Sequence, residues 1–143
     1  MEYRDQKSTA VNLAGVELKN PVMVASGTFG SGEEYSEFVD LNRLGAVVTK
    51  GVANVPSRDL PFLEQFDTRV IVNVCGKSEQ DYLEVVERLG DEPRVDMLEI
   101  NISCPNVKEG GIAFGQDPRA VEAITKAVKA KAKQPVIMKL SPN

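Results

Sequence analysis

This 143-residue chain contains no histidine, so its chemistry has to come from thiols, amines, amides, carboxylates and hydroxyls. That absence excludes Ser-His and Cys-His nucleophilic pairs and His-based metal sites. Any general base has to be Cys, Lys, Asp, Glu or Tyr. Of the two cysteines, Cys104 lies in a dense polar segment, Asn101–Asn106 (NISCPN), ahead of Gly110-Gly111. A loop of this kind could close over a substrate and expel water.

Cys104 is therefore the candidate reactive thiol. It follows an apolar run, and a thiol there can accept a proton when nearby cations bring its pKa towards neutrality. The alternative is that Cys104 is a small packed hydrophobe. The other cysteine, Cys75, follows Asn73-Val74 in an apolar pattern, and we interpret it as a packed thiol.

Polar residues stand at the ends of apolar, β-branched runs. The runs are Val22–Ser26, Ala46–Lys50, Val70–Val74, Met97–Ile102 and Val136–Leu140. They are typical of parallel strands that are covered on both faces. The polar residues at their ends are Ser26, Lys50 with Gly51, Asn73, Asn101 with Ser103, and Lys139. Because parallel α/β folds bind ligands at the carboxyl ends of their strands, we expect these residues to converge.

Singly, each of these residues has a simpler explanation, since a strand-end lysine is usually solvated and a strand-end asparagine usually caps a turn. As a set they point to a ligand. Lys50 and Lys139 interrupt runs that are otherwise apolar, and a buried ammonium without a partner is costly. The only carboxylate expected beside them is Glu99, which alternation directs the same way as Asn101. We expect a planar ligand with carbonyl and ring-nitrogen edges and an anionic group, and no divalent metal.

Helical patterns connect several of the runs. Glu33–Leu44 carries apolar residues at helical spacing. Ser78–Leu89 opens with a Ser N-cap and Asp81 three residues later, a variant of the capping box. Asp117–Lys133 opens with Asp-Pro and ends in lysines that suit a helix C-terminus. Before them, Ala10–Lys19 alternates around Ala14-Gly15 and predicts a β-hairpin.

The connection between Lys50 and Val70 is short for a crossover, because its prolines leave room for about two helical turns at best. A closed eight-stranded barrel needs roughly 250 residues. The pattern therefore predicts a single domain, residues 1–143, in the α/β class: an incomplete (β/α)8 TIM barrel with about five of eight strands. An open five-stranded parallel sheet is the alternative.

Composition limits the partners. The net charge is −4 with no basic block, which disfavours nucleic acid and anionic membranes. The sequence contains no run of 18 apolar residues, so it predicts no membrane-spanning helix. The polar segment Met1–Ala10 does not look like a signal peptide. We expect a cytoplasmic protein with free thiols.

Three segments carry a resemblance to a known family. They are Ala25–Gly30 (ASGTFG), Asn101–Gly111 (NISCPNVKEGG) and Lys139–Asn143 (KLSPN), and together they resemble class 1 dihydroorotate dehydrogenases. The resemblance runs from Val11 to Asn143, and the form of the loop is similar to the B-type catalytic subunit. It implies an FMN-binding TIM barrel that oxidises (S)-dihydroorotate to orotate in pyrimidine (UMP) biosynthesis.

Residue by residue, the resemblance makes Cys104 the base that takes the C5 proton of dihydroorotate, while a hydride passes from C6 to N5 of FMN. It implies FMN contacts from Ser26, Lys50, Gly51, Asn73, Asn101 and Lys139. It implies substrate contacts from Lys50, Asn101 and Asn106. Electrons would pass to NAD through a partner subunit with FAD and a 2Fe-2S cluster, in a heterotetramer built on a homodimer of catalytic subunits.

The chain departs from the family pattern in two places. After Val52 the family has a further segment with an Asn-x-Ile-Gly-Leu motif that is absent here, and beyond Asn143 it has further strands with FMN phosphate-binding loops. Two other interpretations stay open. One is a Schiff-base aldolase-type barrel with Lys50 or Lys139 as the amine, and the other is an inactive structural fragment of the enzyme.

Overall fold

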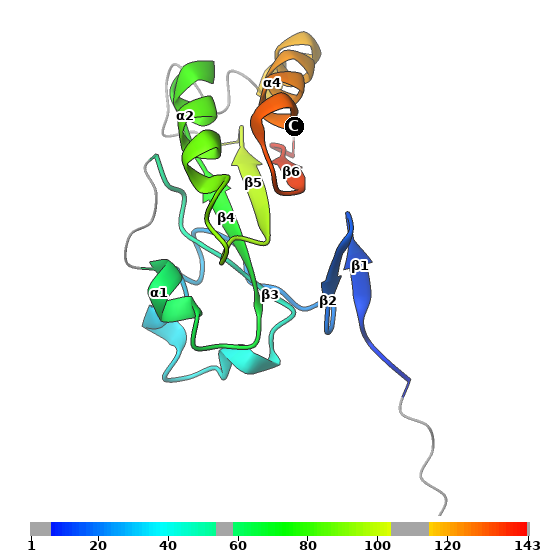
Figure 1. Cartoon of the computed structure of the whole chain (residues 1–143), viewed down its shortest axis with the longest axis vertical. Coiled ribbons are helices and arrows are strands. Elements are labelled where there is room, and N and C mark those ends of the chain that lie inside the picture. The colour runs from blue at the N-terminus through cyan, green and yellow to red at the C-terminus, as the bar shows by residue number, and fades with distance from the viewer. Residues whose placement is uncertain (1–6, 54–58, 104–114, 143) are drawn as a thin grey trace, which may run out of the picture.

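In the computed structural model, which describes residues 7–53, 59–103 and 115–142, a parallel sheet forms the centre of the chain (Figure 1). Its strands are β3 (Ala46–Val48), β4 (Arg69–Val74), β5 (Met97–Asn101) and β6 (Val136–Lys139). A separate antiparallel hairpin consists of β1 (Val11–Leu13) and β2 (Val16–Leu18). The helices are α1 (Asp59–Leu63), α2 (Glu79–Leu89) and α4 (Pro118–Lys131), with 3-10 turns η1 (Glu33–Tyr35) and η2 (Leu41–Arg43).

The sheet order is β3-β4-β5-β6, so neighbours in the sheet are also neighbours in the chain, and every pair is parallel. Parallel strands joined in chain order by crossovers on one side are what a (β/α)8 barrel requires. In a doubly wound sheet the order would reverse at a switch point. The predicted α/β class and the incomplete barrel are confirmed.

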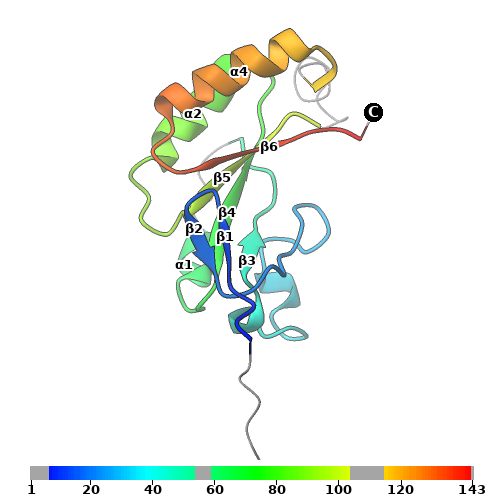
Figure 2. The same ribbon diagram turned by 90° about the vertical axis from the view of Figure 1, so that its right-hand side faces the viewer.

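The two faces of the sheet are covered differently. Figure 2 shows α2 and α4 lying together over one side of the sheet. This outer face is apolar along its length, with Val70, Val72, Val74, Leu98, Ile100 and Ile102 buried in one cluster with Tyr82, Val85, Val86 and Leu89 of α2 and Ile124 and Val128 of α4. The inner face carries a smaller cluster, in which Ala46, Val48, Ile71 and Met97 pack against Leu18 of the hairpin.

Local signals read from the sequence are confirmed. The Ser78 hydroxyl accepts from the Asp81 backbone N–H, and the Asp81 carboxylate accepts in return from the Ser78 N–H, which completes the capping box of α2. Asp117 caps α4 with Pro118 at its first position. The hairpin turns at Ala14 and Gly15, with φ of 50° and 92°. Positive φ at both central turn residues matches the twist of the flanking strands.

The strand predicted at Val22–Ser26 is wrong as a full strand. The segment lies parallel to β3 and makes one bridge, between Met23 and Ala46. Backbone N–H groups of Gly45 and Val24 donate to Val22 and Ala46 at 2.8 Å and 3.4 Å. No other described strand borders its far side, and Val22 is 58% exposed. An edge segment with one neighbour keeps only part of its ladder.

The helix predicted at Glu33–Leu44 is also wrong, because only the 3-10 turns η1 and η2 form. The Asp40 carboxylate accepts from the Asn42 backbone N–H at 3.0 Å and starts a new turn. Aspartate that bonds to the nearby backbone competes with a continuous helix in this way. Phe38, whose spacing favoured the helix, is 80% exposed.

The short crossover is confirmed. Its described helix, α1, has five residues. None of the helices in residues 7–53, 59–103 and 115–142 has the length and apolar composition needed to cross a bilayer.

Candidate active site

Strand register brings polar residues together on the inner face, at the carboxyl ends of β4, β5 and β6. Asn73 lies opposite Glu99, and Asn101 lies opposite Lys139. Register-paired residues of parallel strands point to the same face, and residues two apart on one strand share it. The polar row therefore stands directly beyond the apolar layer of Ile71 and Met97.

Hydrogen bonds join these side chains into one network. The Asn73 Nδ2 group donates to Glu99 Oε1 at 2.5 Å, and Asn101 Nδ2 donates to Asn73 Oδ1 at 3.3 Å. The Ser103 hydroxyl and backbone N–H donate to Asn101 Oδ1 at 2.8 Å and 3.2 Å. Asn73 and Asn101 are buried, at 0% and 9% exposure. The Lys139 ammonium lies 3.9 Å from Glu99 Oε1.

The network fixes the direction of both amides, because a carboxylate can only accept. Glu99 holds the nitrogen of Asn73, so the oxygen of Asn73 is left to accept from Asn101. The oxygen of Asn101 in turn accepts from Ser103. Among the described residues, the second N–H of each amide has no acceptor, and both amides lie beside the Lys139 ammonium. Such an edge favours a ligand that presents hydrogen-bond acceptors.

The Lys50 ammonium does not lie in this network. Its side chain is 59% exposed and forms an ion pair with Glu34 of η1, whose side chain is 45% exposed. The expectation of a buried ammonium without a partner is therefore wrong for Lys50. The expectation that Glu99 is the only nearby carboxylate is wrong as well. For Lys139, half-buried with Glu99 as its neighbour, a carboxylate on the same face reduces the cost of burial.

The ion pair shifts both groups in the direction that keeps them charged. The hydrogen bond from Lys50, with smaller contributions from backbone N–H groups, lowers the pKa of Glu34 to about 2. The same bond raises the pKa of Lys50 above its ordinary value. Sequence patterns did not predict this pair, since the two residues are far apart in the chain and the helix expected around Glu34 does not form.

Gly51 is where the chain after β3 passes close to the network. A Cβ at Gly51 would lie 2.6 Å from Cys75 Sγ and 2.9 Å from Asn73 Oδ1. The backbone N–H of Val52 donates to the Asn73 carbonyl at 2.9 Å and keeps this passage tight. Glycine is the residue that permits such an approach.

Cys75 contacts the same asparagine. Its thiol is half-buried, and its Sγ donates to Asn73 Oδ1 at 3.4 Å. The interpretation of Cys75 as a packed thiol holds only in part, because the thiol touches a polar group. It also borders a cavity of about 340 Å³ beside the start of α2 that Lys77, Asp81 and Arg88 help to line.

The remaining predicted site residues are placed less fully. Ser26 is half-buried, and within the described ranges no hydrogen bond joins its side chain to the network. Cys104 and Asn106 lie outside the described residues, directly after Ser103. In the part of the chain that is described, no group of three or more His, Cys, Asp or Glu could hold a metal ion.

A parallel sheet in chain order, covered by helices on its outer face and bearing a polar edge at its carboxyl ends, defines part of a (β/α)8-barrel enzyme fold. The family model described as dihydroorotate dehydrogenase matches residues 8–61 and 51–143. The chain belongs to the dihydroorotate dehydrogenase family. This confirms the family resemblance read from the sequence.

Curated relatives agree on the type of subunit. The chain is 58% identical over 167 residues to a protein of Lachnoclostridium phytofermentans, covering 95% of this chain and 55% of the relative. It is 55% identical over 164 residues to one of Alkaliphilus metalliredigens, covering 93% and 54%. It is 46% identical over 165 residues to one of Listeria welshimeri, covering 94% and 54%. All three are named dihydroorotate dehydrogenase B (NAD(+)), catalytic subunit.

Two features of these matches concern length. The chain spans about half the length of the curated relatives it matches. The family model matches in two sections that overlap at residues 51–61, as expected when family positions are absent at this point. The overlap coincides with the short crossover that contains α1.

Proposed function

We propose that the complete protein containing this chain oxidises dihydroorotate to orotate, with FMN as the hydride acceptor, in pyrimidine biosynthesis. The observation that carries the proposal is the donor-rich network of Asn73, Asn101 and Lys139 at the carboxyl edge of a barrel sheet in this family. Relatives that match the chain over nearly its whole length are named as catalytic subunits of this dehydrogenase.

The described residues fit a flavin by their chemistry. A flavin ring presents carbonyl and ring-nitrogen acceptors, and its reduced form is anionic, so it is stabilised by cations and N–H donors. The inner-face edge offers amide donors and the Lys139 ammonium, and the bare Gly51 backbone lets the chain approach the network closely. We propose that Ser26, Lys50, Gly51, Asn73, Asn101 and Lys139 bind FMN.

For the substrate we propose contacts from Lys50, Asn101 and Asn106. Dihydroorotate carries a carboxylate and ring carbonyls, which the same kinds of donor recognise. When bound, FMN supplies the acceptor for the hydride that leaves C6. Cys104 is the proposed base for the C5 proton, and its loop would exclude water from the site.

The proposed electron route continues in another subunit. The relatives' names combine NAD with a catalytic subunit, which supports a partner that passes electrons to NAD. We propose that this partner carries FAD and a 2Fe-2S cluster, and that catalytic subunits pair as a homodimer inside a heterotetramer.

The state of Lys50 argues against the alternative of a Schiff-base aldolase-type barrel. A Schiff-base lysine needs a lowered pKa so that its amine is free to attack. The hydrogen bond from Lys50 to Glu34 instead raises the pKa of Lys50. Family membership also points away from the aldolase alternative.

The test uses the complete protein and its Cys104→Ser variant, with dihydroorotate oxidation followed in single-turnover experiments by bleaching of the flavin band. A serine hydroxyl is a much weaker base at neutral pH, so we expect the rate to fall by at least about 100-fold while orotate still binds. Cys75→Ser is the matched control and should stay within about three-fold of wild type. A colourless wild-type protein, or an unchanged rate in Cys104→Ser, would refute the proposed function.

A further inference from the structure

The loop between Gly27 and Tyr35 is folded around one carboxylate, that of Glu34. The backbone N–H of Ser31 donates to Glu34 Oε2 at 3.1 Å, and the backbone N–H of Lys50 donates to Ser31 Oγ at 3.2 Å. The Lys50 ammonium donates to the other carboxylate oxygen, Oε1. These bonds close a ring that ties the loop to the carboxyl end of β3.

The backbone of the loop is suited to this position of Glu34. Gly30 has φ of 63°, and a Cβ there would collide with the Glu34 carboxylate. Gly32 has φ of 104°, which side chains other than glycine's rarely allow. The rings of Phe29 and Tyr35 stack at a centroid distance of 4.8 Å across the two ends of the loop.

Ser31 is the buried member of the ring, with 4% exposure. It joins the two charged residues through both its N–H and its hydroxyl, so the position of Glu34 depends on the end of β3 and not on η1 alone. An ordinary surface ion pair between flexible side chains has no such support and contributes little. The ring restricts the Lys50 side chain, which otherwise carries a large rotamer entropy.

We propose that Glu34 is a positioning residue for Lys50, and that its carboxylate holds the ammonium at the edge where the ligand binds. This inference rests on the proposed function, in which Lys50 contacts FMN and the substrate. Glu34 occupies one of the three ammonium hydrogens, and the others remain for the ligand. Glu34 acts through Lys50 and is not itself a ligand contact.

Two opposite effects on ligand binding separate this inference from simple electrostatics. If Glu34 only placed a negative charge near an anionic ligand, its removal would tighten binding. If Glu34 positions Lys50, its removal leaves the ammonium to sample many rotamers and weakens binding. The sign of the change is therefore informative.

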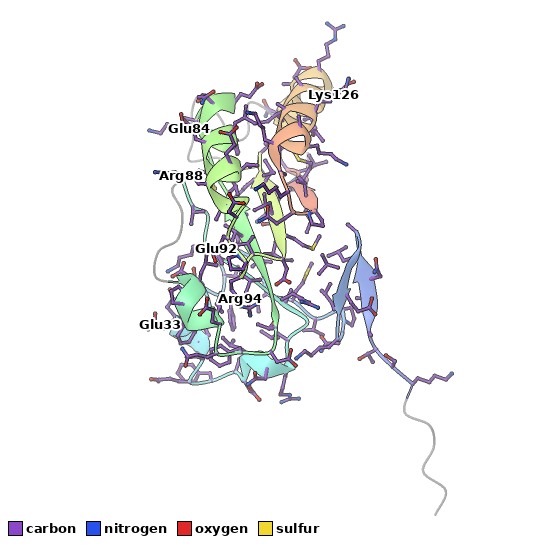
Figure 3. All side chains as sticks on the ribbon, viewed as in Figure 1. Glu33, Glu84, Arg88, Glu92, Arg94 and Lys126 are labelled. Atoms are coloured by element: carbon purple, nitrogen blue, oxygen red, sulfur yellow. The ribbon has the colours of Figure 1, made fainter. Side chains whose placement is uncertain are left out.

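The experiment is an FMN titration of the apo form of the complete protein, followed by flavin fluorescence. We expect Glu34→Gln to raise the Kd for FMN about five-fold. Glu33→Gln removes the same charge from the neighbouring residue, whose side chain makes no hydrogen bond or ion pair among the described residues, and should leave the Kd within about two-fold. Figure 3 labels Glu33 at the outer side of the η1 turn.

A double-mutant cycle shows whether the effect passes through the lysine. In a Lys50→Gln background, Glu34→Gln should change the Kd by less than about two-fold, because the group it positions is gone. Glu34→Asp keeps the charge but shortens the side chain by one methylene. Its Kd for FMN should lie between those of wild type and Glu34→Gln. This variant also serves if Glu34→Gln does not fold.

The outcomes distinguish the two claims. Tighter or unchanged binding in Glu34→Gln, or an equal change in both backgrounds, overturns the inference while the proposed function stands. A wild-type protein that binds no FMN overturns both.

Discussion

The two faces of the sheet are built from the same strands but hold different chemistry. On β4, Val70, Val72 and Val74 point to the helices and are fully buried. The alternate residues Ile71 and Asn73 point inward, apolar at the hairpin end and polar at the carboxyl end. Because side chains alternate along a strand, one sequence can give stability to the outer face and ligand chemistry to the inner face.

The comparison teaches where substitutions should act. Substitutions on the outer face should alter the free energy of unfolding with little specific effect on ligand binding. Substitutions in the inner polar row should weaken ligand binding with little effect on the free energy of unfolding. The predictions below test that division in the complete protein, from the largest expected effect to the smallest.

Leu98→Ala should have the largest effect on stability. Leu98 is 0% exposed in the outer cluster, and removing a buried leucine side chain leaves a cavity that costs about 3 kcal/mol. Urea unfolding followed by circular dichroism measures the loss. Phe38→Ala is the control, because Phe38 is 80% exposed and its replacement should cost below about 0.5 kcal/mol. Equal losses in the two variants would show that the outer cluster is not a packed core.

Arg94→Lys should have the second-largest effect on the free energy of unfolding. One Arg94 nitrogen donates to the carbonyls of Leu63, Phe66 and Thr68 at 2.9, 3.1 and 2.8 Å, between α1 and the amino end of the sheet (Figure 3). The other terminal nitrogen of Arg94 lies 3.4 Å from Asp96 Oδ2. A single lysine ammonium cannot reach both the carbonyls and Asp96, so we expect a loss of about 2 kcal/mol in urea unfolding.

Arg119→Lys is the matched control for Arg94→Lys. Arg119 is an exposed residue of α4, and its replacement should change stability by less than about 0.5 kcal/mol. If both variants unfold at the same urea concentration, the carbonyl contacts of Arg94 do not stabilise the fold.

Glu99→Gln tests the inner face. Glutamine can donate as well as accept, so the Asn73 amide is no longer held in one direction and Lys139 loses its nearest carboxylate. We expect the Kd for FMN to rise about ten-fold, equal to about 1.4 kcal/mol. The exposed Glu64→Gln is the control. Unchanged FMN binding in Glu99→Gln would mean that the network does not prepare the edge for the ligand.

The smallest expected effect is on the pH dependence of stability. Because the folded-state pKa of Glu34 is about 2, below its ordinary value of 4.5, its contribution is present above pH 4.5 and is lost as the pH falls from 4.5 towards 2. Wild type should therefore lose slightly more stability than Glu34→Gln across this range in acid urea unfolding. The side chains of Glu34 and Lys50 are both largely exposed, so solvent screening keeps the difference in stability small. If the free energies of unfolding of the two proteins fell in parallel with pH, the predicted contribution of Glu34 would be contradicted.

Much of the fold follows from local patterns. The capping box at Ser78, the Asp117 cap and the Ala14-Gly15 turn depend on neighbours within a few residues, and each formed as predicted. Strand alternation also predicted that Glu99 and Asn101 share a face. These signals are local, so the sequence carries them directly.

What the sequence did not predict depends on distant contacts. Glu34 contacts Lys50 because the glycine-rich loop folds back to the end of β3. The spacing of apolar residues along the sequence does not predict this fold. The apolar spacing of Glu33–Leu44 favoured a helix, but the Asp40 cap and the exposure of Phe38 show that tertiary context decided otherwise. The reach of Cys104 into the site stays a prediction.

The most direct test of the central claim is FMN titration of the apo form of the complete protein and of its Lys139→Met variant. If the inner polar edge binds the flavin, wild type should saturate at one FMN per chain, and Lys139→Met should bind at least about ten-fold more weakly. Lys129→Met, on the last turn of α4, should bind like wild type. Equal FMN affinity in wild type and Lys139→Met, or no binding by either, would contradict the account.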